Sequence, residues 1–135
     1  MLRMPWDTLR ERQLEGLHAR GFRDLHPAHL TVFQWPGPVD VRPVDLAVRT
    51  RMSKQAMNHL LGQLERLGYL TRRLDPHDQR YTRVDLTARG EAAIRAIREI
   101  IEEVEAEWRA KIGPRRFAEL KTLLSELAAT EPAQT

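Results

Sequence analysis

The sequence has 135 residues, a calculated pI of about 9.8 and no cysteine. Its length predicts one domain, and the absence of cysteine excludes disulfides, thiolate metal sites and thiol redox chemistry. No apolar run approaches the roughly 20 residues that span a bilayer, and the N-terminus lacks the apolar segment of a signal peptide. We therefore expect a cytoplasmic protein without a membrane partner.

Positive charge is concentrated in the middle of the sequence. Residues 42–90 contain ten Lys or Arg against five Asp or Glu, whereas residues 1–41 are neutral and residues 91–135 carry a net charge of −2. A basic segment of this kind is where an anionic partner binds. Charge alone is weak support for nucleic-acid binding, because a basic protein is often simply basic.

Two helices and a short strand are expected in the first third of the chain. Residues 6–20 carry apolar side chains at helical spacing, and Gly21 is placed to end that helix. Residues 27–35 predict a second, short helix that Pro27 opens. The alternation over residues 39–41 indicates a short strand.

A helix–turn–helix is expected next. Residues 43–50 form its first helix, Arg51 begins the turn, and Ser53 is a good N-cap for a second helix that Gly68 closes. Apolar side chains in this second helix recur every three or four residues and define a buried stripe. The stripe consists of Ala56, Met57, Leu60, Leu61, Leu64 and Leu67.

The opposite face of the second helix consists of amides and bases with almost no acids. Amide side chains such as Gln55 and Asn58 can pair with adenine in the major groove of DNA, and Ser53 and Lys54 at the helix start are placed for phosphates. The alternative is an ordinary solvent-exposed amphipathic helix. The predicted DNA contacts on this helix are Ser53, Lys54, Gln55, Asn58, His59 and Gln63.

A basic hairpin follows, with strands expected over residues 69–74 and 81–86. An arginine on its tip can enter the narrow minor groove, where negative potential is focused. Asp78 can hold the Arg80 guanidinium in place, although such a pair is often only a surface ion pair worth under about 1 kcal/mol. The predicted contacts on the hairpin are Arg72, Arg73, Asp78, Arg80 and Arg83.

Two further helices complete the chain. Thr87 is an N-cap for a helix over residues 88–111, Gly113-Pro114 breaks it, and residues 115–129 form the last helix. The longer helix carries a wide apolar stripe, which either a partner subunit or the protein's own core would cover. The stripe consists of Ala93, Ile94, Ile97, Ile100, Ile101, Val104, Trp108 and Ile112.

Two motifs make a family resemblance specific. The pattern Asp75-Pro76-x-Asp78-x-Arg80 followed by Leu86-Thr87-x-x-Gly90 resembles the wing signature of the MarR family of bacterial winged-helix regulators. The stretch MSKQAMNHLLGQLERLGYLTRR, residues 52–73, resembles the recognition helix and first wing strand of that family. The resemblance covers roughly residues 27–112.

The resemblance implies a mainly α fold with a small β-hairpin wing (α+β). It implies one domain over residues 1–135, with a winged helix-turn-helix over residues 27–87. Residues 1–22 and 88–129 would then provide N- and C-terminal dimerisation helices. Family members often carry glycine where this chain has Arg51, and a non-glycine residue disfavours a positive φ, so we expect the turn to differ locally.

The implied function is that of a sequence-specific transcriptional regulator that binds pseudo-palindromic operator DNA as a homodimer. Arg80 matches the family's wing arginine, and Asp78 matches the acid that orients it. The alternative is a winged-helix protein-interaction module without DNA-reading activity. No enzyme is expected, because the sequence shows no glycine-rich phosphate loop and no Ser–His–Asp order with local motif support.

The histidines and tryptophans are the remaining candidates for ligand binding. In the resembling family this region often lines a pocket for a small-molecule effector. His26 and His29 have metal-ligand spacing, but two ligands without a carboxylate at a helical offset do not make a site. We favour structural histidines, and expect no metal and no cofactor. The residues concerned are Trp6, His18, His26, His29 and Trp35.

Overall fold

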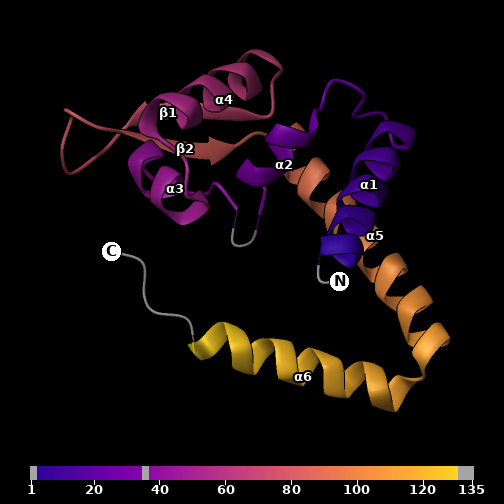
Figure 1. Ribbon diagram of the computed structural model, residues 1–135. Helices are drawn as coiled ribbons and strands as arrows, with labels where there is room; N and C mark the ends of the chain where they lie inside the picture. Colours follow the sequence, from indigo (N-terminus) through magenta and orange to yellow (C-terminus); the bar gives the residue numbers. More distant parts are fainter. Residues whose placement is uncertain (1–2, 35–36, 131–135) are drawn as a thin grey trace.

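A computed structural model describes residues 3–34 and 37–130 of the chain (Figure 1). Within these residues the chain forms six helices and one antiparallel hairpin, which confirms the expected α+β class. The elements are α1 (Arg3–Ala19), α2 (Pro27–Val32), α3 (Pro43–Thr50), α4 (Lys54–Arg66), β1 (Leu70–Leu74), β2 (Thr82–Leu86), α5 (Ala88–Ile112) and α6 (Pro114–Thr130).

The ends of two elements differ from the expected ones by three residues. α1 begins three residues earlier than predicted, at Arg3. α2 ends at Val32 because Phe33 leaves the helical conformation and packs into the core against Tyr69, with 6.0 Å between the ring centroids. Trp35 and residues 131–135 lie outside the described residues.

The prediction of a strand over residues 39–41 is wrong. Asp40 has a φ of 49°, which interrupts the extended backbone that a strand needs. What remains is one antiparallel bridge between Val41 and Val84, with backbone hydrogen bonds of 2.7 and 3.4 Å. This bridge ties the segment before α3 to the hairpin, which itself pairs in the register Leu70↔Leu86 to Leu74↔Thr82.

One apolar core joins all these elements except α6. Its deepest members come from α1, the helix–turn–helix, the hairpin and α5, and each buried side chain of this kind contributes about 1.5–3 kcal/mol. These members include Leu17, Leu25, Leu46, Met57, Leu61, Leu64, Tyr69, Leu70, Val84, Ala93, Ile100 and Val104. The apolar stripe predicted for α4 is therefore largely confirmed, and the protein's own core covers much of the stripe on α5.

The junction between the hairpin and α5 is fixed by close packing. Thr87 caps α5 by accepting a hydrogen bond from the Gly90 backbone N–H at 3.1 Å, as expected. A side chain at Gly90 would collide with the carbonyl of Tyr69. The hydroxyl of Tyr69 donates to Asp24, and Arg89 donates to both of these side chains.

The two terminal helices lie away from the hairpin. α1 packs along α5, where Arg12 and Glu107 form two hydrogen bonds of 2.6 and 2.9 Å. α6 turns back beneath the molecule after Gly113, which has a φ of 93° (Figure 1). None of the described helices is sufficiently long and apolar to cross a bilayer.

Candidate nucleic-acid interface

The turn before α4 adopts a left-handed conformation without glycine. Arg51 has φ 58° and ψ 39°, so the expectation that this residue type would change the turn is wrong. Its backbone N–H is bonded to the carbonyls of Ala47 and Val48, and these bonds hold the strained conformation. Ser53 then caps α4 by accepting a hydrogen bond from the Ala56 backbone N–H at 3.1 Å, as predicted.

The polar side of α4 faces solvent. Lys54, Gln55, Asn58 and His59 are all exposed, whereas the apolar side of the same helix is buried. The Asn58 amide is already oriented: its Nδ2 donates to the Lys54 carbonyl at 2.9 Å, and its Oδ1 accepts from Arg72 at 3.3 Å. Arg72 thus holds Asn58 in position by hydrogen bonds and does not extend into solvent.

Gln63 lies half-buried and bonds to histidines on two elements. Its Oε1 is 2.8 Å from Nε2 of His29, which is buried on α2. Its Nε2 is 3.1 Å from Nε2 of His59 on the exposed face of α4. The predicted contacts His59 and Gln63 therefore form one bonded group.

The wing presents one arginine far into solvent. The Arg80 side chain is 81% exposed, and its Nε and Nη2 donate to the Asp78 carboxylate at 3.0 and 2.8 Å. Asp78 also accepts from the Arg80 backbone N–H at 3.1 Å. The Arg80 guanidinium holds the pKa of the Asp78 carboxyl below its usual value. This is the fork geometry in which a carboxylate orients an arginine.

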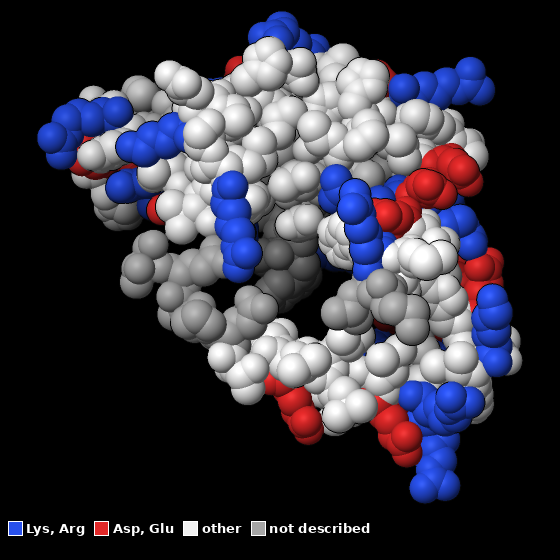
Figure 2. All heavy atoms as spheres, viewed as in Figure 1, with Lys and Arg blue, Asp and Glu red and all other residues white. Residues whose placement is uncertain are grey.

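The other two predicted wing arginines pair within the protein. Arg73 bonds to Asp85 at 2.6 Å and to Asp40 at 2.5 Å. Arg83 donates to Asp75 at 2.9 Å and to the Asp40 carbonyl at 2.8 Å. Arg73 and Arg83 are 43% and 24% exposed, so Arg80 is the wing arginine that reaches furthest into solvent. Figure 2 shows Lys and Arg side chains grouped over this end of the molecule, at the left.

Sequence reasoning missed Arg42 and Tyr81. Arg42 precedes α3, and its guanidinium lies 4.5 Å from the centroid of the Tyr81 ring and 2.9 Å from Asp75. One groove brings Arg42 and Tyr81 together with the predicted Lys54, Asn58 and Arg80. Arg42 is 33 residues from Asp75 in the sequence, so only its place within the basic segment could have signalled this role.

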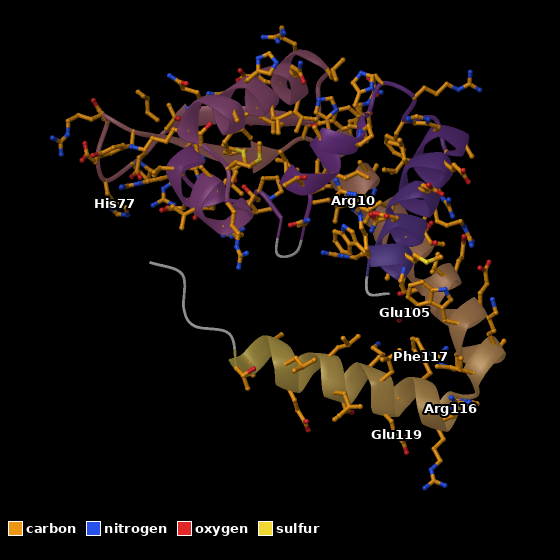
Figure 3. The ribbon with its side chains drawn as sticks, in the orientation of Figure 1. Arg10, His77, Glu105, Arg116, Phe117 and Glu119 are labelled. Carbon is orange, nitrogen blue, oxygen red and sulfur yellow. The ribbon has the colours of Figure 1, made fainter. Side chains whose placement is uncertain are left out.

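The buried carboxylate of Asp75 anchors the base of the wing tip. Besides its two arginines, it accepts the His77 backbone N–H at 2.8 Å. That backbone bond, together with Arg42 and Arg83, holds the pKa of Asp75 well below its usual range. Figure 3 shows His77 at the tip of the hairpin, away from the body of the molecule.

Those candidate ligand-binding residues that the structure describes do not converge on one site. His18 donates to the Leu25 carbonyl at 2.8 Å, and His29 is buried and hydrogen-bonded. Trp6 is half-exposed and lines an apolar pocket with Trp108, between α1, α5 and α6. The described residues contain no cluster of three or more His, Cys, Asp or Glu that could hold a metal ion.

Comparison with known proteins adds to this geometry. The MarR family profile matches residues 24–80, from the segment before α2 to the wing tip. The HTH-type transcriptional regulator FarR of Neisseria gonorrhoeae is 30% identical over 117 residues, which cover 81% of this chain and 79% of the relative. The chain belongs to the MarR family. It is therefore a MarR-family transcriptional regulator, as the wing motif implied.

Solved structures agree with this MarR-family assignment. The transcriptional regulator Tm0710 of Thermotoga maritima superimposes with a TM-score of 0.65 and 27% identity, over 95% of this chain and 89% of that one. FabT of Streptococcus pneumoniae in complex with DNA gives a TM-score of 0.73 at 20% identity, over 95% and 93%. The second likeness shows the shared winged-helix fold, in which α4 is the second helix of the helix–turn–helix and β1–β2 the wing.

Proposed function

We propose that this regulator binds operator DNA with α4 in the major groove and Arg80 in the adjacent minor groove. The observation that carries the proposal is the placement of both on one rigid unit. Lys54 and Asn58 from α4 and Arg80 from the wing share a groove, and Asp75 anchors the wing base to the start of α3. Positively charged and amide side chains on one face match phosphates and base edges respectively.

We propose that different parts of the fold bind DNA and form the dimer. Residues 27–87 provide the DNA-binding part, and residues 1–22 and 88–129 provide the dimerisation helices. Side chains of the first part are proposed to act in two ways. Ser53, Lys54, Gln55, Asn58, His59 and Gln63 face DNA directly, whereas Arg72, Arg73, Asp78 and Arg83 hold those contacts in place.

We further propose that two copies assemble through their terminal helices. α6 buries Phe117 against the body of the protein but exposes Leu123 and Leu127, with exposed fractions of 57% and 64%. In Figure 3 Phe117 points toward the rest of the molecule and Glu119 points away from it. A second copy would cover the remaining apolar side chains, and a two-fold pair would place recognition helices about 34 Å apart, one turn of DNA.

The proposal needs no catalytic group, and the family relatives are regulators rather than enzymes. A small-molecule effector stays a prediction. The apolar pocket lined by Trp6 and Trp108 is also lined by Leu120 and Leu124 of α6, and in the proposed dimer the partner subunit would contact it. An effector there would act by changing the separation of the two recognition helices.

The decisive experiment is a fluorescence-anisotropy titration of the full chain. The probes are DNA selected from a random pool and a scrambled duplex of the same composition, each measured at two salt concentrations. We expect tight, selective binding with a steep salt dependence, because phosphate contacts release counterions. Equal affinity for both duplexes would show a nonspecific binder. Absence of binding would favour a protein-interaction module.

A further inference from the structure

Three hydrogen bonds run from the backbone of His26, the N-cap of α2, to the exposed face of α4. The backbone N–H of His26 donates to Nδ1 of His29 at 3.0 Å. Nε2 of His29 lies 2.8 Å from Oε1 of Gln63, and Nε2 of Gln63 lies 3.1 Å from Nε2 of His59. His29 is 1% exposed, whereas His59 is exposed to solvent.

The first of these three hydrogen bonds determines which atom donates and which accepts in the other two. A backbone N–H can only donate, so Nδ1 of His29 must accept and Nε2 must carry the ring proton. That proton requires an acceptor, which fixes the carbonyl end of the Gln63 amide toward His29. The amide nitrogen then donates to His59. His59 is left with an unprotonated Nε2 and its proton on Nδ1.

We propose that His29 is a positioning residue for base recognition, acting through Gln63 on His59. This inference rests on the proposed DNA-binding function. The buried histidine fixes which polar atoms the exposed end of the chain offers to DNA: the Nδ1–H of His59 and the second amide hydrogen of Gln63. Both are donors, so they select acceptors in the major groove, such as N7 and O6 of guanine.

The resulting form of His59 differs from that of an unconstrained histidine. A neutral imidazole in water favours the proton on Nε2, the opposite of what Gln63 imposes here. Without His29, the Gln63 amide is able to turn over, and His59 returns to the ordinary tautomer. A residue that touches no DNA thereby determines the donor pattern at the interface.

The tautomer is measured directly by nitrogen-15 NMR of the uniformly labelled full chain in mildly alkaline buffer, where histidine side chains are neutral. In the wild type we expect His59 with a protonated Nδ1 and a bare Nε2. Gln63→Glu keeps an acceptor for His29 but has no donor for His59, so Nε2 of His59 should become protonated. His29→Phe should have the same effect. Because Gln63→Glu leaves the buried site intact, it serves where His29→Phe fails to fold.

Base preference is the second readout, obtained by selection from a random pool. His29→Phe and His59→Ala should each lower discrimination about tenfold at the same base pair of the half-site. A wild-type His59 protonated on Nε2 would overturn the inference. So would an unchanged preference in folded His29→Phe, which leaves the proposed function standing. If the wild type selects no DNA sequence, the proposed function itself fails and this inference fails with it, whatever the tautomer.

Discussion

Arg42 and Asp75 join the start of α3 to the base of the wing tip. Nε of Arg42 donates to Oδ2 of Asp75 at 2.9 Å, and Nε of Arg83 reaches the same oxygen at 2.9 Å. Asp75 is fully buried, and its other oxygen accepts the backbone N–H groups of His77 and Asp78. The wing is therefore attached to the helix–turn–helix by a satisfied buried carboxylate, which sets the position of Arg80 relative to α4.

Asp75→Asn should destabilise the protein and loosen the wing. The amide cannot compensate two guanidinium groups, and a buried charge left without its partner is costly. We expect a lower melting temperature together with weaker operator binding, measured by circular dichroism and anisotropy. Asp85→Asn is the matched control, because Asp85 pairs with Arg73 nearer the surface. An equal loss of stability in both variants would show that the buried Asp75 contributes no more to stability than Asp85 does.

The same carboxylate should make stability depend on pH. Its pKa in the folded protein lies below the unfolded value of about 3.9. Such a group stabilises the fold fully above about pH 4, and this stabilisation is lost as the pH falls toward the folded-state pKa. The free energy of unfolding, measured with urea, should thus fall more steeply below pH 4 for the wild type than for Asp75→Asn. Parallel curves for the two proteins would refute the linkage.

Arg80→Ala should weaken DNA binding without unfolding the protein. The side chain is mostly exposed, and its partners among the described residues are Asp78 and the Tyr81 ring, 5.7 Å away, so its loss removes little folding free energy. In a dimer, two wing contacts are lost. The plot of log affinity against log salt concentration has a negative slope, and the magnitude of that slope should decrease by about two, one for each wing. Arg116→Ala, which removes the same charge from α6, should leave the slope unchanged.

Gln55→Ala should relax base preference at one position of the half-site. Gln55 is exposed on α4, and a bidentate amide–adenine pair contributes about 1–3 kcal/mol of discrimination. Lys54→Ala is the informative comparison, because losing a phosphate contact weakens all sequences about equally. Random-pool selection with each variant distinguishes the two roles. If Gln55→Ala returns the wild-type motif, Gln55 does not read a base.

The element order and the two faces of α4 could be predicted from the sequence, because both depend on local signals. Ser53, Thr87 and Gly113 mark helix ends by capping chemistry and backbone conformation. The 3.6-residue spacing of apolar side chains identified the buried stripe. The motif from Asp75 to Arg80 then placed the exposed arginine on the wing.

The parts that could not be predicted depend on contacts between distant segments. Arg42 reaches Asp75 across 33 residues, and His29 reaches Gln63 across 34. Nothing in the sequence around Arg83 indicates that it pairs with Asp75 and with the Asp40 carbonyl. Asp40 likewise ends the expected strand with a positive φ, a conformation that Asp adopts more readily than most residues.

Two glycines should respond in opposite directions to alanine. At Gly90 a methyl group would collide with the Tyr69 carbonyl, so overpacking should cost about 1–3 kcal/mol or more. At Gly62, within α4, the nearest atoms are flexible arginine ends at 3.5 and 3.8 Å. Gly62→Ala should raise stability by about 0.5–1 kcal/mol through helix propensity. Chemical unfolding of both variants tests this, and a tolerated Gly90→Ala would contradict the close packing of α5 on the wing.

Leu124→Glu should dissociate the proposed dimer. Leu124 is 47% exposed in the single chain and lines the apolar pocket between α1, α5 and α6. In a symmetric dimer a charge enters the interface twice, and each buried leucine contributes about 1.5–3 kcal/mol. Sedimentation should show the 15.7 kDa monomer for this variant and roughly twice that mass for the wild type. Thr122→Glu, on the opposite side of α6, should stay dimeric. A wild-type monomer would contradict two-fold operator binding, because a lone recognition helix reads one half-site only.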